Sequence, residues 1–168
     1  MINNKTYKLV LSAVFCALVF AMTYISIPTP PIGNINLGDC MIIICACVLG
    51  GAYSVLAGAL GATLCDIASG YVIYAPATFV IKAVMILIIL TFRKQILKNK
   101  GYLSLILSGI LAELVMIAGY FLYEAIFLSY GFGAIANIPF NAIQGVINIV
   151  VSILIFVLLK RINLIKND

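Results

Sequence analysis

The chain has 168 residues, of which 65% are hydrophobic and 9% are charged, whereas ordinary soluble domains are roughly half apolar and about a quarter charged. This composition, with a mean hydropathy of +1.24, excludes a soluble domain. At about 20 residues per membrane-spanning helix, the length has room for about six spans and for no extramembrane domain. The sequence therefore predicts an all-α integral membrane protein that forms one domain, 1–168.

The formal net charge is +5, with ten Lys and Arg against five Asp and Glu. The placement of the basic residues indicates membrane topology and argues against a nucleic-acid partner. Apart from Lys82, which lies inside an apolar run, they form three groups: Lys5 and Lys8; Arg93, Lys94, Lys98 and Lys100; and Lys160, Arg161 and Lys166.

The first predicted helix, 7–27, ends at a proline-rich stretch, 28–34, that cannot continue a helix and forms a structured outer loop. No short apolar core with a small-residue cleavage site follows the basic start, so we interpret this helix as retained. The stretch 39–69 is interrupted only by Gly50 and Gly51, and it can form one helix or two. Only two crossings keep all three basic groups inside, as the positive-inside rule requires. Six spans follow, with both termini cytoplasmic: 7–27, 39–50, 52–69, 75–92, 102–128 and 139–159.

Charged side chains in hydrocarbon are costly and usually mark a function. In the six-helix arrangement Asp39, Asp66, Lys82 and Glu124 all lie in the outer half of the membrane. Lys82 is about 10 Å inward from the outer end of its helix by helical rise. Glu113 lies deeper, near the middle. These positions predict a polar pocket that opens outward.

Other polar side chains share helical faces with these charges. On the fifth helix Glu113, Tyr120 and Glu124 lie on one face, and on the fourth Thr78 stands one turn before Lys82. On the sixth, one stripe carries four amides: Asn137, Asn141, Gln144 and Asn148. Together these groups predict a site for a small polar, ring-shaped ligand.

A structural interpretation of the same residues is also open. The amides can serve only to join helices by hydrogen bonds. Lys82 can form an ion pair with Asp66 or Glu113 and still line a site, and Asp39 can be the N-cap of the second helix.

Two sets of small residues allow close approach of another helix, either within the bundle or from a partner protein. They are Ala13, Ala17 and Ala21 in the first helix, and Ala57, Gly58, Gly61 and Ala62 in the third.

Several kinds of chemistry are excluded. The chain has no histidine and no P-loop, which argues against histidine-based catalysis and ATP hydrolysis. Its five cysteines are odd in number and lack a CxxC pair, so we expect no disulfide framework, no metal site and no cofactor. We expect no enzyme activity. Uptake then needs an energy source elsewhere, unless the chain is a stand-alone proton- or ion-coupled carrier in which Glu113 and Lys82 relay protons. A membrane scaffold is the third possibility.

The sequence resembles the S components of energy-coupling factor (ECF) vitamin transporters, in the riboflavin-type group that includes pyridoxine and hydroxymethylpyrimidine carriers. The resemblance rests on the order of short runs over the first half of the chain: 27–30 (IPTP), 36–39 (NLGD), 50–51 (GG), 57–61 (AGALG), 66–71 (DIASGY) and 74–82 (YAPATFVIK). Asn36 and Tyr74, which stand in these runs, complete the predicted substrate site.

The resemblance implies a vitamin-binding subunit of the cytoplasmic membrane that docks on a transmembrane coupling subunit with two cytosolic ATPases. It implies a pocket toward the outside, partly covered by the loop after the first helix, and release of substrate by toppling in the membrane. It also implies that Ala13, Ala17 and Ala21 contact the coupling subunit. For the substrate, the absence of Trp and the amide-rich lining favour vitamin B6 or a related pyrimidine, with riboflavin next.

Overall fold

The computed structural model describes residues 5–30, 33–93 and 101–162. It contains six α-helices, which confirms the predicted all-α, six-helix fold. Four residues of the basic groups that the sequence places inside lie outside the described residues: Lys94, Lys98, Lys100 and Lys166. The helices are α1 (Lys5–Tyr24), α2 (Gly38–Val48), α3 (Gly51–Ala68), α4 (Ala75–Thr91), α5 (Gly101–Leu122) and α6 (Ile138–Arg161).

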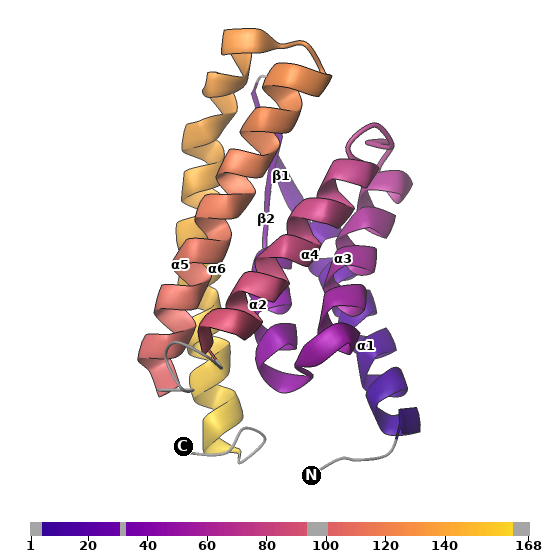
Figure 1. Cartoon of the computed structure of the whole chain (residues 1–168), viewed down its shortest axis with the longest axis vertical. Coiled ribbons are helices and arrows are strands. Elements are labelled where there is room, and N and C mark those ends of the chain that lie inside the picture. Colours follow the sequence, from indigo (N-terminus) through magenta and orange to yellow (C-terminus); the bar gives the residue numbers. More distant parts are fainter. Residues whose placement is uncertain (1–4, 31–32, 94–100, 163–168) are drawn as a thin grey trace.

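The helices form a bundle in which α2 is the central element. Neighbouring pairs run α1 with α3, α3 with α4, α4 with α5 and α5 with α6, while α2 contacts α1, α3, α4 and α6 (Figure 1). Most of α2 is buried, including Ile42, Ile43 and Cys45. This position explains why α2 is apolar on all sides, since a helix enclosed by neighbours has no solvent-facing stripe.

The break between α2 and α3 falls at the predicted glycine pair. Gly50 and Gly51 both have φ of +63°, a backbone region that glycine enters without steric cost. The long apolar stretch therefore turns back on itself. With their short continuations, four helices (α1, α3, α5 and α6) are long and apolar enough to cross a bilayer, while the apolar helices α2 and α4 are shorter.

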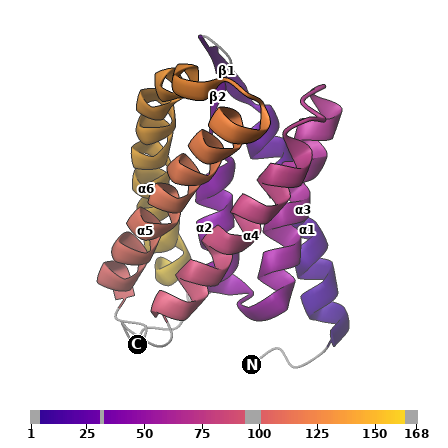
Figure 2. The same ribbon diagram turned by 45° about the horizontal axis from the view of Figure 1, so that its top comes forward.

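The segment after α1 forms a β-hairpin that the sequence did not predict. α1 ends at Tyr24, three residues earlier than expected, and the strands β1 (Ser26–Thr29) and β2 (Gly33–Asn36) pair antiparallel. Pro28 is tolerated because both strands of a two-stranded ribbon are edges. The hairpin strands lie at one end of the bundle (Figure 2), so the described residues on either side of positions 31–32 in the predicted loop form paired strands.

At the same end, the connection from α5 to α6 is also helical. α5 continues into a π-turn over Tyr123–Phe127, and a 3₁₀ helix over Gly131–Asn137 leads into α6. The Leu128 N–H donates to the Tyr123 carbonyl at 3.1 Å, the wider spacing typical of π-bulges at functional sites. These turns bring Glu124 and Asn137 together.

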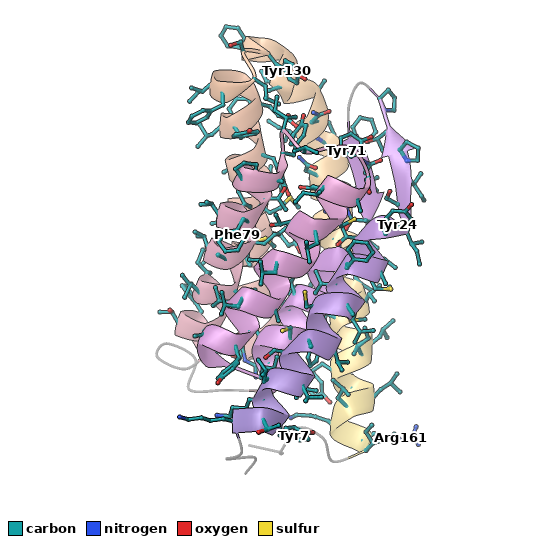
Figure 3. All side chains as sticks on the ribbon, turned by 90° about the vertical axis from the view of Figure 1, so that its right-hand side faces the viewer. Tyr7, Tyr24, Tyr71, Phe79, Tyr130 and Arg161 are labelled. Atoms are coloured by element: carbon teal, nitrogen blue, oxygen red, sulfur yellow. The ribbon has the colours of Figure 1, made fainter. Side chains whose placement is uncertain are left out.

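The two ends of the bundle differ in character. Tyr7 and Arg161 mark the end where α1 begins and α6 ends, and Tyr71 and Tyr130 mark the opposite end (Figure 3). The described basic residues other than Lys82 belong to the first end, near the start of α1 and the ends of α4 and α6. By the positive-inside rule we expect this end to be cytoplasmic.

The two small-residue sets have different surroundings. In α3 the set is buried within the bundle, and a Cβ added at Gly61 would lie 2.5 Å from the Cys16 carbonyl oxygen of α1. Ala13, Ala17 and Ala21 are exposed instead, on the side of α1 away from its buried Phe15 and Val19. The α3 set therefore serves internal packing, and the α1 set is available to a partner.

We expect Gly61→Ala to destabilise the protein by about 1–3 kcal/mol, because the added methyl group forces α1 and α3 apart in a close-packed region. The measurement is thermal unfolding in detergent. Gly133→Ala is the matched control, since an added Cβ there meets no atom of the described structure within 4 Å. Equal unfolding temperatures for the two variants would contradict the close α1–α3 contact.

Candidate substrate-binding site

A cavity of about 330 Å³ lies at the end of the bundle covered by the β-hairpin. Its wall is made by the end of α1, the hairpin, α3, the loop before α4, and α4, α5 and α6. The volume falls at the lower end of the roughly 300–1,000 Å³ typical of small-molecule sites. The lining mixes hydroxyl, amide and charged groups with aromatic rings.

The inner wall is held by a buried ion pair. Lys82 Nζ on α4 lies 2.5 Å from Asp39 Oδ1 on α2, with side-chain exposures of 6% and 1%. Gln144 Nε2 on α6 donates to the other carboxylate oxygen, Oδ2, at 2.9 Å. One carboxylate therefore fixes a lysine and an amide that both line the cavity, and their hydrogen bonds offset the loss of hydration of the buried charges.

The hairpin is fastened to α6 through Asn36. Its backbone N–H donates to Gln144 Oε1 at 3.1 Å, and its carbonyl accepts from Asn148 Nδ2 at 2.9 Å. Asn148 Oδ1 in turn accepts from the Cys40 N–H at the start of α2, at 2.8 Å. Asn148 therefore acts behind the wall, joining β2, α2 and α6.

The side of the cavity formed by α4 and α5 carries a hydroxyl pair. The Thr78 hydroxyl and the Tyr120 phenol lie 3.0 Å apart, and Lys82 Nζ lies 5.4 Å from the centre of the Tyr120 ring. The lysine charge thus interacts with both a carboxylate and an aromatic face. This holds the Tyr120 ring against the cavity.

The outer rim is built around Glu124. Its carboxylate accepts from Asn137 Nδ2 at 2.8 Å and from the Tyr74 hydroxyl at 3.4 Å. Tyr123 ties the loop before α4 to the π-turn, since its hydroxyl donates to the Ile73 carbonyl at 2.5 Å. Burial, and secondly the charge of Glu124, raise the pKa of Tyr74, so the phenol stays protonated and donates.

Several polar atoms of the wall have no hydrogen-bond partner within the described part of the chain: Thr23 Oγ1, Thr29 Oγ1 and Asp66 Oδ2. All three residues line the cavity. A buried polar atom without a partner is unfavourable, so these three atoms mark places where the wall leaves hydrogen-bonding capacity unused.

Ten of the thirteen residues predicted for substrate binding line the cavity. Of the other three, Asp39 and Asn148 support the wall from behind. Glu113 is buried on α5 against Gly145 of α6, and its carboxylate oxygens have no hydrogen-bond partner among residues 5–30, 33–93 and 101–162. The ten lining residues are Asn36, Asp66, Tyr74, Thr78, Lys82, Tyr120, Glu124, Asn137, Asn141 and Gln144.

The prediction missed eleven lining residues. Six of them come from the end of α1 and the unpredicted hairpin, and Tyr71 and Phe140 add aromatic surface. The missed residues of α1 and the hairpin lie in or beside the predicted outer loop, which could have indicated them. No spacing rule, however, shows which side chains of such a loop turn inward. The missed residues are Thr23, Ser26, Pro28, Thr29, Gly33, Asn34, Ala62, Cys65, Ser69, Tyr71 and Phe140.

Two structural interpretations of the charged residues were wrong. The ion-pair partner of Lys82 is Asp39, not Asp66 or Glu113. Asp39 does not cap α2 either, since Leu37 is the N-cap residue and makes no side-chain capping bond. Because α2 is central, the Asp39 carboxylate faces α4 and α6 and finds better partners there than its own helix end.

The arrangement of the lining suits the binding of a small molecule. Among the described residues no three His, Cys, Asp or Glu side chains are grouped to hold a metal ion, and the described cysteines are free thiols. The cavity is lined by donors, acceptors and aromatic rings, which is the composition of a small-molecule site.

Comparison with known proteins agrees with this description. Residues 3–161 match the family model described as "ECF-type riboflavin transporter, S component". An uncharacterised protein from Pyrococcus woesei, described as lying in the gap 3′ region, is 31% identical over 136 residues, which cover 80% of this chain and 88% of that protein. A solved structure, "Structure and mechanism of the S component of a bacterial ECF transporter", superposes with a TM-score of 0.76 at 22% identity, over 95% of this chain and 98% of the other.

The family match extends over nearly the whole chain. S components of ECF transporters are non-enzymatic, substrate-binding subunits of the cytoplasmic membrane that associate with an energising module. The predicted absence of enzyme activity, the membrane location and the need for an external energy source are thereby confirmed. This chain belongs to the family of ECF-type riboflavin transporter S components.

Proposed function

We propose that this protein captures riboflavin from outside the cell in the cavity beneath the β-hairpin and delivers it to an ECF module for uptake. The observation that carries this proposal is the cavity beneath the hairpin, whose lining includes ten of the residues that the sequence predicts for substrate binding. The family match indicates the substrate.

The aromatic content of the wall supports a flavin. Tyr71, Tyr74, Tyr120 and Phe140 all contribute to the lining, and Tyr and Phe rings stack favourably on flat ring systems. The polar edge of an isoalloxazine ring needs donors and acceptors, which Lys82 and Gln144 offer on the inner wall.

The vitamin B6 or pyrimidine substrate that we favoured from the sequence has no support in the comparisons. The chain lacks Trp, but four Tyr and Phe rings line one cavity. The smaller vitamins therefore enter as competitors in the binding test.

Docking on the module is the second part of the proposal. We propose that Ala13, Ala17 and Ala21 contact the transmembrane coupling subunit, and that two cytosolic ATPases supply the energy. In support, these alanines form an exposed stripe of small side chains, a surface that another helix can approach closely.

We expect the purified protein to carry, or to bind with one-to-one stoichiometry, riboflavin in preference to pyridoxine and hydroxymethylpyrimidine. The measurement is native mass spectrometry with extraction of the co-purified compound, followed by titration of the emptied protein with each vitamin. Preferential binding of a smaller vitamin would overturn the flavin assignment, and absence of any saturable binding would favour a membrane scaffold.

A stand-alone ion-coupled carrier is separated by a transport assay. Vesicles that contain this chain alone should bind riboflavin and accumulate none, with or without an imposed pH gradient. Vesicles that contain the complete module should accumulate it on addition of ATP. Gradient-driven accumulation by the single chain would contradict the proposal and would assign Glu113 a role in proton transfer.

A further inference from the structure

At the basic end of the bundle, opposite the cavity, two cations lie over one aromatic ring. The Arg93 guanidinium at the end of α4 is centred 5.5 Å from the Phe156 ring of α6, and Lys160 Nζ lies 5.6 Å from the same ring. Lys160 Nζ also lies 5.0 Å from the Tyr102 ring of α5, which meets Phe156 edge-on. Two basic side chains, from the segment after α4 and from α6, therefore contact the Phe156 ring, and α5 contributes a second ring, Tyr102.

Arg93 is 9% exposed, and the residues that the structure describes leave most of its donors unused. A guanidinium has five N–H donors, and the bond found for it in the described part of the chain is one from Nη1 to Cys47 Sγ, at 2.5 Å. Sulfur is a weak acceptor. No Asp or Glu of the described residues forms an ion pair with Arg93.

A buried cation without an anionic partner is unfavourable. A guanidinium fork fits a phosphate through two parallel hydrogen bonds, and a nearby ammonium adds charge. By the positive-inside rule this end faces the cytoplasm, where basic pockets between membrane helices bind anionic headgroups. Val157, exposed on α6 and three residues before Lys160 on the same helical face, provides apolar surface for an acyl chain.

We propose that Arg93 and Lys160 form a binding site for the phosphate of an anionic phospholipid in the cytoplasmic leaflet. The site takes one headgroup at the junction of α4, α5 and α6, with the guanidinium and the ammonium on the phosphate oxygens. It is separate from the vitamin cavity, whose lining includes none of Arg93, Tyr102, Phe156 and Lys160.

The test uses the full chain in nanodiscs of equal phosphatidylglycerol and phosphatidylcholine, with native mass spectrometry of the released complexes. We expect the protein to retain phosphatidylglycerol preferentially and Arg93→Gln to lower this retention about tenfold, the effect of losing a charge-assisted bidentate contact. Arg161→Gln is the matched control: it removes the same charge from an exposed neighbour on α6 and should leave retention unchanged.

Further variants test whether a loss of retention reflects misfolding, and competition with inorganic phosphate tests whether the bound phosphate belongs to a lipid. Arg93→Lys keeps the charge without the fork, so we expect intermediate retention. If Arg93→Gln fails to fold, Lys160→Gln carries the test, with a several-fold loss expected. Riboflavin binding should be unchanged in each folded variant. Equal retention of the two lipids, no loss in either glutamine variant, or displacement of the lipid by submillimolar inorganic phosphate would overturn the proposal.

Discussion

Lys82→Met is expected to destabilise the protein by about 3–5 kcal/mol and to weaken riboflavin binding by at least roughly tenfold. The first effect arises because Asp39, 1% exposed, is left as a buried carboxylate that has lost its cation. The second arises because Lys82 lines the cavity, and the variant no longer offers the ligand the hydrogen-bond donor of its ammonium group. The measurements are unfolding in detergent and vitamin titration of the folded fraction.

A double variant separates the two effects. Asp39→Asn combined with Lys82→Met removes both charges, and neutralising a whole buried pair is often nearly neutral for stability. We therefore expect the double variant to regain most of the lost stability. Binding should stay weak, because Asp39 lies behind the wall and only Lys82 reaches the cavity.

Lys5→Met, at an exposed position at the basic end of α1, is the control for loss of one positive charge and should change neither quantity. Recovery of full affinity in the double variant would show that Lys82 acts only through the fold. Unchanged stability in the single variant would mean that the Asp39–Lys82 pair contributes little to the bundle.

The helix plan could be predicted from the sequence because it depends on one-dimensional signals. Apolar run length and the positions of the basic groups select six helices, and Gly50 and Gly51 mark the α2–α3 turn. The hairpin escaped prediction because each strand has four residues, too few for an alternation pattern, and because Pro28 argues against a strand.

The site was predictable in composition but not in pairing. Helical spacing correctly put Gln144 and Asn148 on an inward face, since a period is visible within one helix. The partner of Lys82 depends on how far α2 is shifted along α4, and no sequence pattern records that shift. Asp39 therefore looked like a helix cap, although it is the residue that orients Lys82 and Gln144.

The sequence likewise does not show which of the two small-residue sets packs against another helix of the bundle. Spacing alone made the α1 alanines and the α3 set equivalent. Only the packing distinguishes them, since Gly61 meets the backbone of α1 at Cys16 while Ala17 is exposed. An exposed stripe of small residues on a membrane helix does not contribute to the internal packing of the monomer. It is therefore the strongest candidate for the surface that contacts the coupling subunit.

Ala17→Leu is accordingly expected to reduce ATP-dependent riboflavin uptake by more than about tenfold while leaving riboflavin affinity and unfolding temperature unchanged. A leucine side chain at the middle of the stripe keeps another helix from approaching closely, but it meets no packed neighbour within the monomer. The measurements are uptake into vesicles with the complete module, co-purification with the coupling subunit, and titration of the isolated protein.

Two control variants test whether the larger side chain at position 17 causes the loss of uptake. Ala17→Ser keeps the side chain small and should retain uptake. Val146→Phe enlarges an exposed side chain on α6, on the other side of the bundle from α1 (Figure 1), and should also retain it. Loss of uptake in Val146→Phe would mean that any bulky change in the lipid-facing surface disturbs transport, and normal uptake in Ala17→Leu would place the coupling subunit elsewhere. If Ala17 belongs to a docking surface and the vitamin binds in the cavity at the end of α1, the expected result is loss of uptake with intact binding.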